Sequence, residues 1–156
     1  MNDAQLLLGN QICFPIYSAS RLITKAYKPY LQEMGLTYPQ YLVLMVLWEQ
    51  DAQTVNQLKE KLMLDTNTLS PMLKRMEKNG LLKRNRSSQD ERSVILQLTE
   101  SGKQLKLQAL PIPEKLIKEI LSHNIPLEDM LKLKDILSEL IAVLGPNCQA
   151  TNCTKA

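Results

Sequence analysis

Cys13 is the residue of this chain whose type and position best suit redox chemistry. We expect it in the first turn of a helix, where the positive end of the helix dipole favours the thiolate, the form that attacks a peroxide oxygen. Tyr17 lies four residues further on, on the same helical face, so its phenol is near enough to donate a hydrogen bond to the sulfur. The alternative is an inert cysteine that packs as a small apolar residue.

All seven aromatic residues lie in the first third of the chain, beginning next to the cysteine; they are Phe14, Tyr17, Tyr27, Tyr30, Tyr38, Tyr41 and Trp48. An apolar pocket of this composition would suit an organic hydroperoxide better than hydrogen peroxide. Fourteen residues of straight helix span about 21 Å, so any contact between Tyr27 and Cys13 requires a second subunit. Ordinary core packing explains Tyr41 and Trp48 better than a binding site does.

A second group of residues suits contact with phosphates. The segment from Lys74 to Arg92 contains seven basic and three acidic residues, so it carries +4 while the rest of the chain sums to −1. Such a cluster is typical of a nucleic-acid-binding surface, although a solvated charged face is the plainer alternative. Thr68 and Ser70 are short enough to contact base edges, and Arg92 suits the minor groove.

The role expected of Cys13 requires a helix that begins near it. Apolar residues recur at spacings of three and four over residues 12–34, which predicts such a helix. We expect this helix to start near Cys13, because Pro15 is tolerated in a first turn. Pro29 predicts a bend, and Gly35 ends the helix.

The basic segment requires a helix-turn-helix. Capping boxes predict one helix to about residue 50 and a short one to about residue 62; they pair Thr37 with Gln40 and Thr54 with Gln57. Asp65 can cap a further helix that runs to Asn79, with Gly80 as its stop. Two short helices, a tight turn and a second helix with small polar residues at its start are what this motif needs.

A β-hairpin follows, because residues 81–86 and 92–98 flank a turn-rich segment and the second of them alternates at the strand period. A hairpin in this place is the wing of a winged helix. A helix from residue 99 to about residue 121 is expected to kink at Pro111 and Pro113. A last helix covers residues 127–144, and a polar tail over residues 147–156 is expected to be disordered.

The predicted fold class is therefore mainly α with a small β-hairpin wing. We expect a single domain over residues 1–146, with the winged helix-turn-helix at about 37–99 and flanking helices at about 12–34 and 100–144. The flanking helices carry apolar stripes that one chain would leave exposed, so a twofold dimer is expected.

Several other classes of protein are excluded. The longest apolar run, Tyr41 to Trp48, is too short to span a bilayer, and the first twenty residues lack the basic start of a secretory signal, so we expect a cytoplasmic protein without a membrane partner. Phosphate-binding glycine motifs are absent. His123, Cys148 and Cys153 would supply three ligands at a spacing that is not typical of a zinc site, so neither a metal nor a cofactor is expected.

Two sets of motifs resemble a known family. Residues 70–77 (SPMLKRME), Gly80-Leu81 and Asp90-Glu91-Arg92, in this order of elements, resemble the MarR family of dimeric transcription regulators. Further matches resemble the organic hydroperoxide resistance repressors within that family; they are residues 10–14 (NQICF), Tyr17, Lys25, residues 27–29 (YKP) and residues 37–41 (TYPQY).

The resemblance implies roles for individual residues. It makes Cys13 the peroxide-sensing thiol, with Tyr17, Tyr27 and Tyr38 as its hydroxyl-bearing neighbours. It assigns the major-groove surface to Thr66, Asn67, Thr68, Ser70, Lys74 and Arg75, with Asn67 at a position where these repressors usually have Gly. It assigns the wing to Arg84, Arg86, Asp90 and Arg92, with Asp90 more suited to orienting Arg92 than to contacting DNA.

The resemblance also implies partners: a pseudo-palindromic operator in double-stranded DNA, a second copy of the chain, and an organic hydroperoxide as inducer. Residues 103–145 contain no cysteine that could resolve an oxidised Cys13, which favours one-cysteine chemistry, although Cys148 or Cys153 could still reach it.

Three alternatives remain at this point. The first is a regulator of the same family that releases DNA when a small aromatic or acidic ligand binds, with Cys13 only packed nearby. A thiol peroxidase is a second, although no resolving cysteine or cation pair surrounds Cys13. A winged helix used only for protein contacts is the third.

Overall fold

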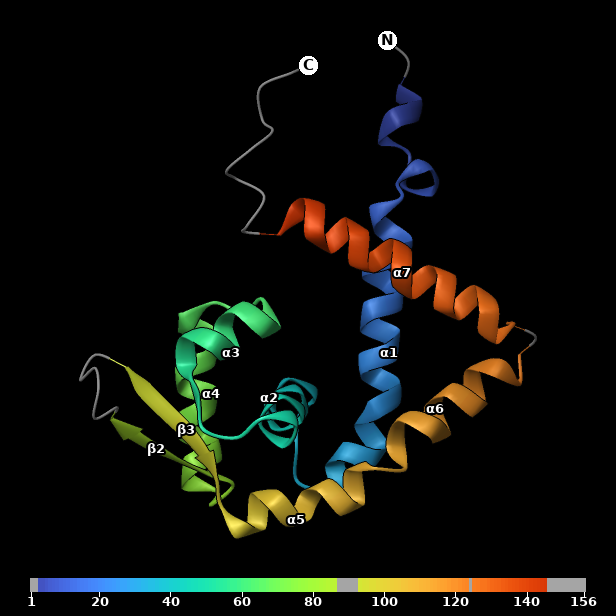
Figure 1. The fold of residues 1–156 in the computed structure, drawn as a ribbon. Helices are drawn as coiled ribbons and strands as arrows, with labels where there is room; N and C mark the ends of the chain where they lie inside the picture. The colour runs from blue at the N-terminus through green and yellow to red at the C-terminus, as the bar shows by residue number, and fades with distance from the viewer. Residues whose placement is uncertain (1–2, 87–92, 124, 146–156) are drawn as a thin grey trace. The chain divides into compact units, whose positions relative to one another are not determined.

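The computed structural model describes residues 3–86, 93–123 and 125–145 (Figure 1). Their contacts group the chain into two compact units, Met1–Ile112 and Pro113–Ala156. Its elements in chain order are the 3₁₀ helices η1 (Asp3–Leu6) and η2 (Leu8–Asn10), then α1 (Cys13–Glu33), α2 (Tyr38–Glu49), β1 (Gln53–Thr54), α3 (Val55–Leu62), α4 (Thr66–Lys78), β2 (Leu82–Arg86), β3 (Val94–Leu98), α5 (Glu100–Ala109), α6 (Ile112–Leu121) and α7 (Leu127–Leu144). This confirms a mainly helical fold with a small sheet.

Helix α1 begins at Cys13, as predicted, and Pro15 lies in its first turn. Pro29 is accommodated inside the helix. The helix ends where Gly35 adopts a left-handed φ of 67°, a conformation that costs glycine little. The two 3₁₀ helices before α1 have no periodic signal in the sequence and were not predicted.

The core of the first unit is built around α2. The predicted capping box is present, with the Thr37 amide donating to Gln40 Oε1 over 2.9 Å. Val43, Leu44 and Leu47 are buried on this helix together with apolar residues of α3, α4, β2 and β3. Because the helix-turn-helix packs on α2, the core fixes the outward face of α4.

Within the part of the chain that the structure describes, the sheet has three strands in the order β1-β3-β2, and both pairs are antiparallel. The predicted hairpin is confirmed in strands β2 and β3, where Arg84 pairs with Leu96. Strand β1 was not predicted, because its two residues are too few to show a period. The turn of the hairpin, residues 87–92, lies outside the described residues.

The expected kinked helix over residues 99–121 is wrong in one respect, because the chain forms two separate helices, α5 and α6. Pro111 and Pro113 cannot donate a backbone hydrogen bond, and two such gaps two residues apart end the helix rather than bend it.

Helix α7 has the predicted bounds and contains no buried residue. No helix within the described residues is both long and apolar enough to cross a membrane. The predicted disordered tail, residues 147–156, lies outside the described part of the chain.

Candidate nucleic-acid interface and thiol site

Local features mark the start and end of helix α3 and the start of helix α4. The Gln57 amide donates to Thr54 Oγ1 over 3.2 Å, and the Thr54 amide donates to Gln57 Oε1 over 2.8 Å, so the predicted capping box is confirmed. Met63 closes α3 in a left-handed conformation, with φ of 51°. Asp65 occupies the N-cap position of α4, but its side chain makes no capping hydrogen bond, so the prediction of a side-chain cap is wrong.

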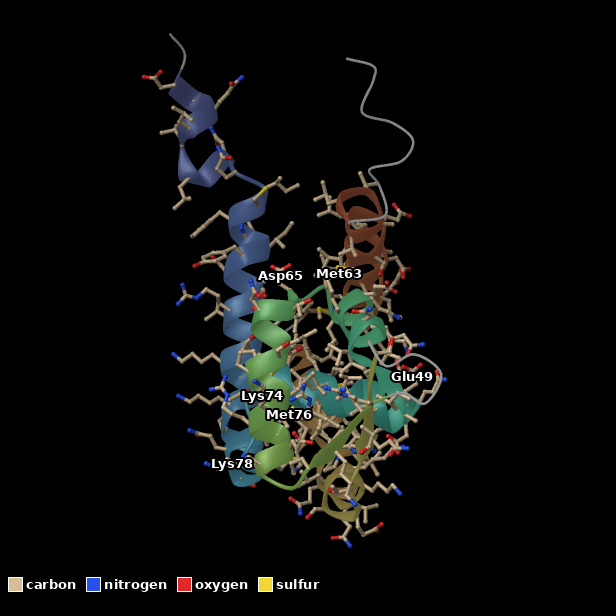
Figure 2. The ribbon with its side chains drawn as sticks, turned by 90° about the vertical axis from the view of Figure 1, so that its left-hand side faces the viewer. Glu49, Met63, Asp65, Lys74, Met76 and Lys78 are labelled. Carbon is tan, nitrogen blue, oxygen red and sulfur yellow. The ribbon has the colours of Figure 1, made fainter. Side chains whose placement is uncertain are left out.

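Helix α4 has one apolar and one polar face. Its buried residues are Leu69, Met72, Leu73 and Met76. The residues predicted to read DNA lie mostly outside this set: Thr66, Asn67, Thr68, Lys74 and Arg75 are exposed, and Ser70 is half-buried. Figure 2 marks Lys74, Met76 and Lys78 along this helix. Short polar side chains at the helix start and cations further along match the division between base readout and phosphate contact.

Strand β2 presents its two predicted wing cations differently. Arg86 is exposed, as a phosphate ligand must be. Arg84 is half-buried, and its Nη1 lies 3.9 Å from Glu77 Oε2 of α4. The predicted wing residues Asp90 and Arg92 lie outside the described residues. Glu77 was missed by the sequence reasoning, because one acidic residue among the basic residues gives no signal of its partner.

The thiol of Cys13 is free and exposed at the first residue of α1. Tyr17, four residues further on, is 56% exposed, and its hydroxyl accepts a 2.8 Å hydrogen bond from Arg21 Nη1. The guanidinium of Arg21 also lies 5.5 Å from the centre of the Tyr17 ring. Arg21 therefore holds the phenol in place while leaving its proton free to be donated.

Tyr27 and Tyr38 lie together, with ring centres 5.0 Å apart, and Tyr41 lies 5.8 Å from Tyr27. Burial raises the pKa of Tyr38, and burial followed by the neighbouring Tyr38 raises the pKa of Tyr27. Both phenols therefore stay protonated at neutral pH and can donate hydrogen bonds. Within one chain they do not meet Cys13, because Tyr27 is on the same helix fourteen residues away, a rise of about 21 Å.

A groove of about 900 Å³ runs along α1 to the start of α2. Its aromatic lining includes Phe14, Tyr17 and Tyr38, and its basic lining comprises Arg21, Lys25 and Lys28. These three cations follow the helical spacing of four and three residues, a signal that the sequence reasoning overlooked. The groove thus combines apolar surface with positive charge beside the predicted sensor residues.

Among the described residues, no three His, Cys, Asp or Glu side chains gather as a metal site would require. Cys148 and Cys153, considered above as zinc ligands or resolving thiols, lie outside the described part of the chain.

Known proteins resemble this chain over most of its length. The profile of the family described as transcriptional regulator SarA/Rot matches residues 25–109. The organic hydroperoxide resistance transcriptional regulator of Bacillus subtilis strain 168 is 49% identical over 137 residues, which cover 88% of this chain and 91% of the relative.

Two solved structures of AbfR from Staphylococcus epidermidis are also similar. Reduced AbfR bound to DNA is 38% identical with a TM-score of 0.69, and the match covers 92% of this chain and 99% of AbfR. Disulfide-formed AbfR is 40% identical with a TM-score of 0.56, and the match covers 90% of this chain and 97% of AbfR.

Proposed function

Because the chain belongs to the MarR-type transcriptional regulators of the SarA/Rot group, we propose that it is a repressor that releases DNA when an organic hydroperoxide oxidises Cys13. The relatives are DNA-binding regulators rather than enzymes, so the expectation of a non-enzymatic protein is confirmed and the thiol peroxidase alternative falls away. The observation that carries the redox part is the exposed Cys13 thiol at the first residue of α1.

The DNA contact is assigned to α4 and the wing. The exposed start of α4 enters the major groove, Lys74 and Arg75 meet phosphates, and Arg86 extends the contact along β2. A dimer with twofold symmetry would place two half-sites with centres about 10 base pairs or a multiple apart. The operator is therefore expected to be pseudo-palindromic.

The sensing step is a two-electron oxidation. The Cys13 thiolate attacks the terminal oxygen of the hydroperoxide, a sulfur–oxygen bond forms and the oxygen–oxygen bond breaks. The hydroperoxide is reduced to an alcohol, whose oxygen takes a proton from a phenol or from water, and the cysteine becomes a sulfenic acid. The exposure of Cys13 at the first residue of α1 supports this step, because a hydroperoxide can reach the sulfur.

A second copy of the chain completes the sensor. Tyr27 and Tyr38 can donate a hydrogen bond to Cys13 only from another subunit, because Tyr27 lies about 21 Å along α1 from Cys13 of its own chain. Apolar residues that precede Cys13 in the sequence are exposed in the single chain, including Leu6 at 84% and Ile12 at 79%, and α7 has no buried residue. Surfaces of this kind favour a homodimer.

One observation favours a second candidate function. The groove along α1 carries Arg21, Lys25 and Lys28 beside aromatic side chains, a lining that suits a small aromatic or acidic ligand. In that case ligand binding would release DNA, and Cys13 would only pack nearby.

One experiment separates the two functions. DNA binding is measured by fluorescence anisotropy, with a duplex that the wild-type protein recovers from a randomised library, before and after stoichiometric cumene hydroperoxide. We expect wild-type protein to release the duplex, at a lower concentration than hydrogen peroxide requires, and Cys13→Ser to bind normally and ignore both oxidants. Release of DNA from Cys13→Ser by the hydroperoxide would end the redox proposal.

A further inference from the structure

Glu77 covers an open edge of the sheet. Strand β2 is at the end of the strand order β1-β3-β2, so no strand of the described residues lies beside the backbone groups on its outer side. The Arg84 amide donates instead to Glu77 Oε1 over 3.0 Å. Glu77 lies in the last turn of α4, so this bond joins the helix that reads DNA directly to the wing strand.

The Arg84 side chain is held on the same carboxylate. Its Nη1 lies 3.9 Å from Glu77 Oε2, and the side chain is 22% exposed. Among the side chains of the described residues, Arg84 Nε is a nitrogen that is buried and has no hydrogen-bond partner. The Arg84 guanidinium turns inward although its buried Nε then lacks a partner, so it is not arranged to reach a phosphate. Arg86, two residues further on, is exposed.

We propose that Glu77 and Arg84 form a clasp that sets the position of the wing relative to α4, and that Arg84 is a positioning residue for DNA binding rather than a phosphate ligand. The inference rests on the proposed contact of α4 and the wing with DNA. Both elements must reach neighbouring grooves at once, so a wing that moves against α4 loses affinity even when every contacting side chain is present.

The clasp and the phosphate-ligand interpretation predict opposite effects of Glu77→Ala on DNA affinity. If Arg84 contacts phosphate, removing the Glu77 carboxylate frees the guanidinium and removes a negative charge near DNA, so Glu77→Ala should bind more tightly. If the pair is a clasp, Glu77→Ala should bind about five- to tenfold more weakly, the loss that corresponds to one or two hydrogen bonds. Glu77→Gln keeps an oxygen for the Arg84 amide and should stay within about twofold of the wild type.

The variants are tested by anisotropy with the library-derived duplex at several salt concentrations. Each phosphate contact contributes about 0.9 to the slope of log affinity against log salt concentration. We expect Arg84→Ala to weaken binding with the wild-type slope, while the control Arg86→Ala lowers the slope by about one. A slope for Arg84→Ala that falls by about one, an unchanged affinity, or tighter binding by Glu77→Ala would overturn the clasp.

Amide hydrogen exchange without DNA tests the clasp separately from the proposed function. We expect the Arg84 amide to be protected in wild-type protein and in Glu77→Gln, and to exchange at least tenfold faster in Glu77→Ala, while core amides of α2 remain protected in all three. Equal protection of the Arg84 amide in Glu77→Ala and wild type would refute the clasp. Failure of wild-type protein to bind any duplex would refute the proposed function and leave this readout intact.

Discussion

The indole Nε1 of Trp48 donates a 2.9 Å hydrogen bond to the carbonyl oxygen of Gly102, across 54 residues of sequence. Lys106 Nζ donates in return to the Trp48 carbonyl oxygen over 3.2 Å. The last turn of α2 and helix α5 are therefore joined twice. Since α2 forms the centre of the helix-turn-helix core, α5 is held directly to the module that is proposed to read DNA.

Gly102→Ala should strongly destabilise the protein. A Cβ atom at this position would lie 2.1 Å from the backbone oxygen of Leu81, which cannot move away as a flexible side chain would. We expect the free energy of unfolding to fall by about 1–3 kcal/mol or more, measured by urea denaturation with circular dichroism. Gly9→Ala is the matched control, because no atom of the described residues lies within 4 Å of its added Cβ. Equal stability of the two variants would contradict this account.

Stability should fall at alkaline pH because of the buried tyrosines. Burial, followed by the neighbouring Tyr27 and Tyr38, raises the pKa of Tyr41 in the folded protein. The unfolded chain therefore loses this proton first, so the free energy of unfolding is unaffected below about pH 10 and declines above it. Tyr41→Phe should show a smaller alkaline decline than wild type, measured by urea denaturation at a series of pH values. Identical curves for Tyr41→Phe and wild type would count against this cause.

A mixed dimer should show that Tyr27 acts on the Cys13 of the partner subunit. Tyr27→Phe alone should oxidise slowly, because a lost phenol hydrogen bond of about 1 kcal/mol or more destabilises the thiolate. A dimer of one Cys13→Ser chain with one Tyr27→Phe chain places the remaining cysteine opposite an intact Tyr27 of the other chain. We expect it to form sulfenic acid at the wild-type rate per thiol, as followed by mass spectrometry. A rate as slow as that of the Tyr27→Phe homodimer would show action within one chain.

Lys74→Ala should weaken DNA binding and lower the salt slope by about one, because Lys74 is an exposed cation on α4. The effect should be nearly equal on a selected duplex and on random DNA, because a phosphate contact carries no sequence information. Lys132→Ala is the control; this lysine lies on α7 and pairs with Glu128 over 2.7 Å. An unchanged slope for Lys74→Ala would remove it from the phosphate contacts.

The cysteines at the end of the chain should be tested as resolving thiols. In a Cys148→Ser, Cys153→Ser double variant, we expect peroxide to release DNA as it does in wild type, since the first oxidation takes place at Cys13 alone. Recovery of DNA binding on addition of a small thiol is then compared between the two proteins. If the double variant recovers DNA binding only with an added thiol and the wild type recovers without one, the tail is a resolving element. Equal recovery in the two proteins supports one-cysteine chemistry.

Local signals in the sequence predicted most of the elements. Thr54 and Gln57 are three residues apart and cap each other, so the start of α3 depends on neighbours alone. The bounds of α7 follow from its apolar spacing and from Gly145 after it. Pro15 placed Cys13 at the start of α1, because proline is tolerated in the first turn of a helix.

Only the tertiary structure decided where side chains from distant segments meet. Strand β1 exists because Gln53 pairs with Leu96, and two residues carry no period of their own. Arg84 and Arg86 are alike in the sequence, yet Arg84 turns to Glu77 because β2 is an edge strand that packs beside α4. Likewise, Trp48 can donate a hydrogen bond to Gly102 only because α5 packs against α2. Contacts of this kind depend on how packed elements meet in space, whereas caps and helix faces depend on residues within one turn.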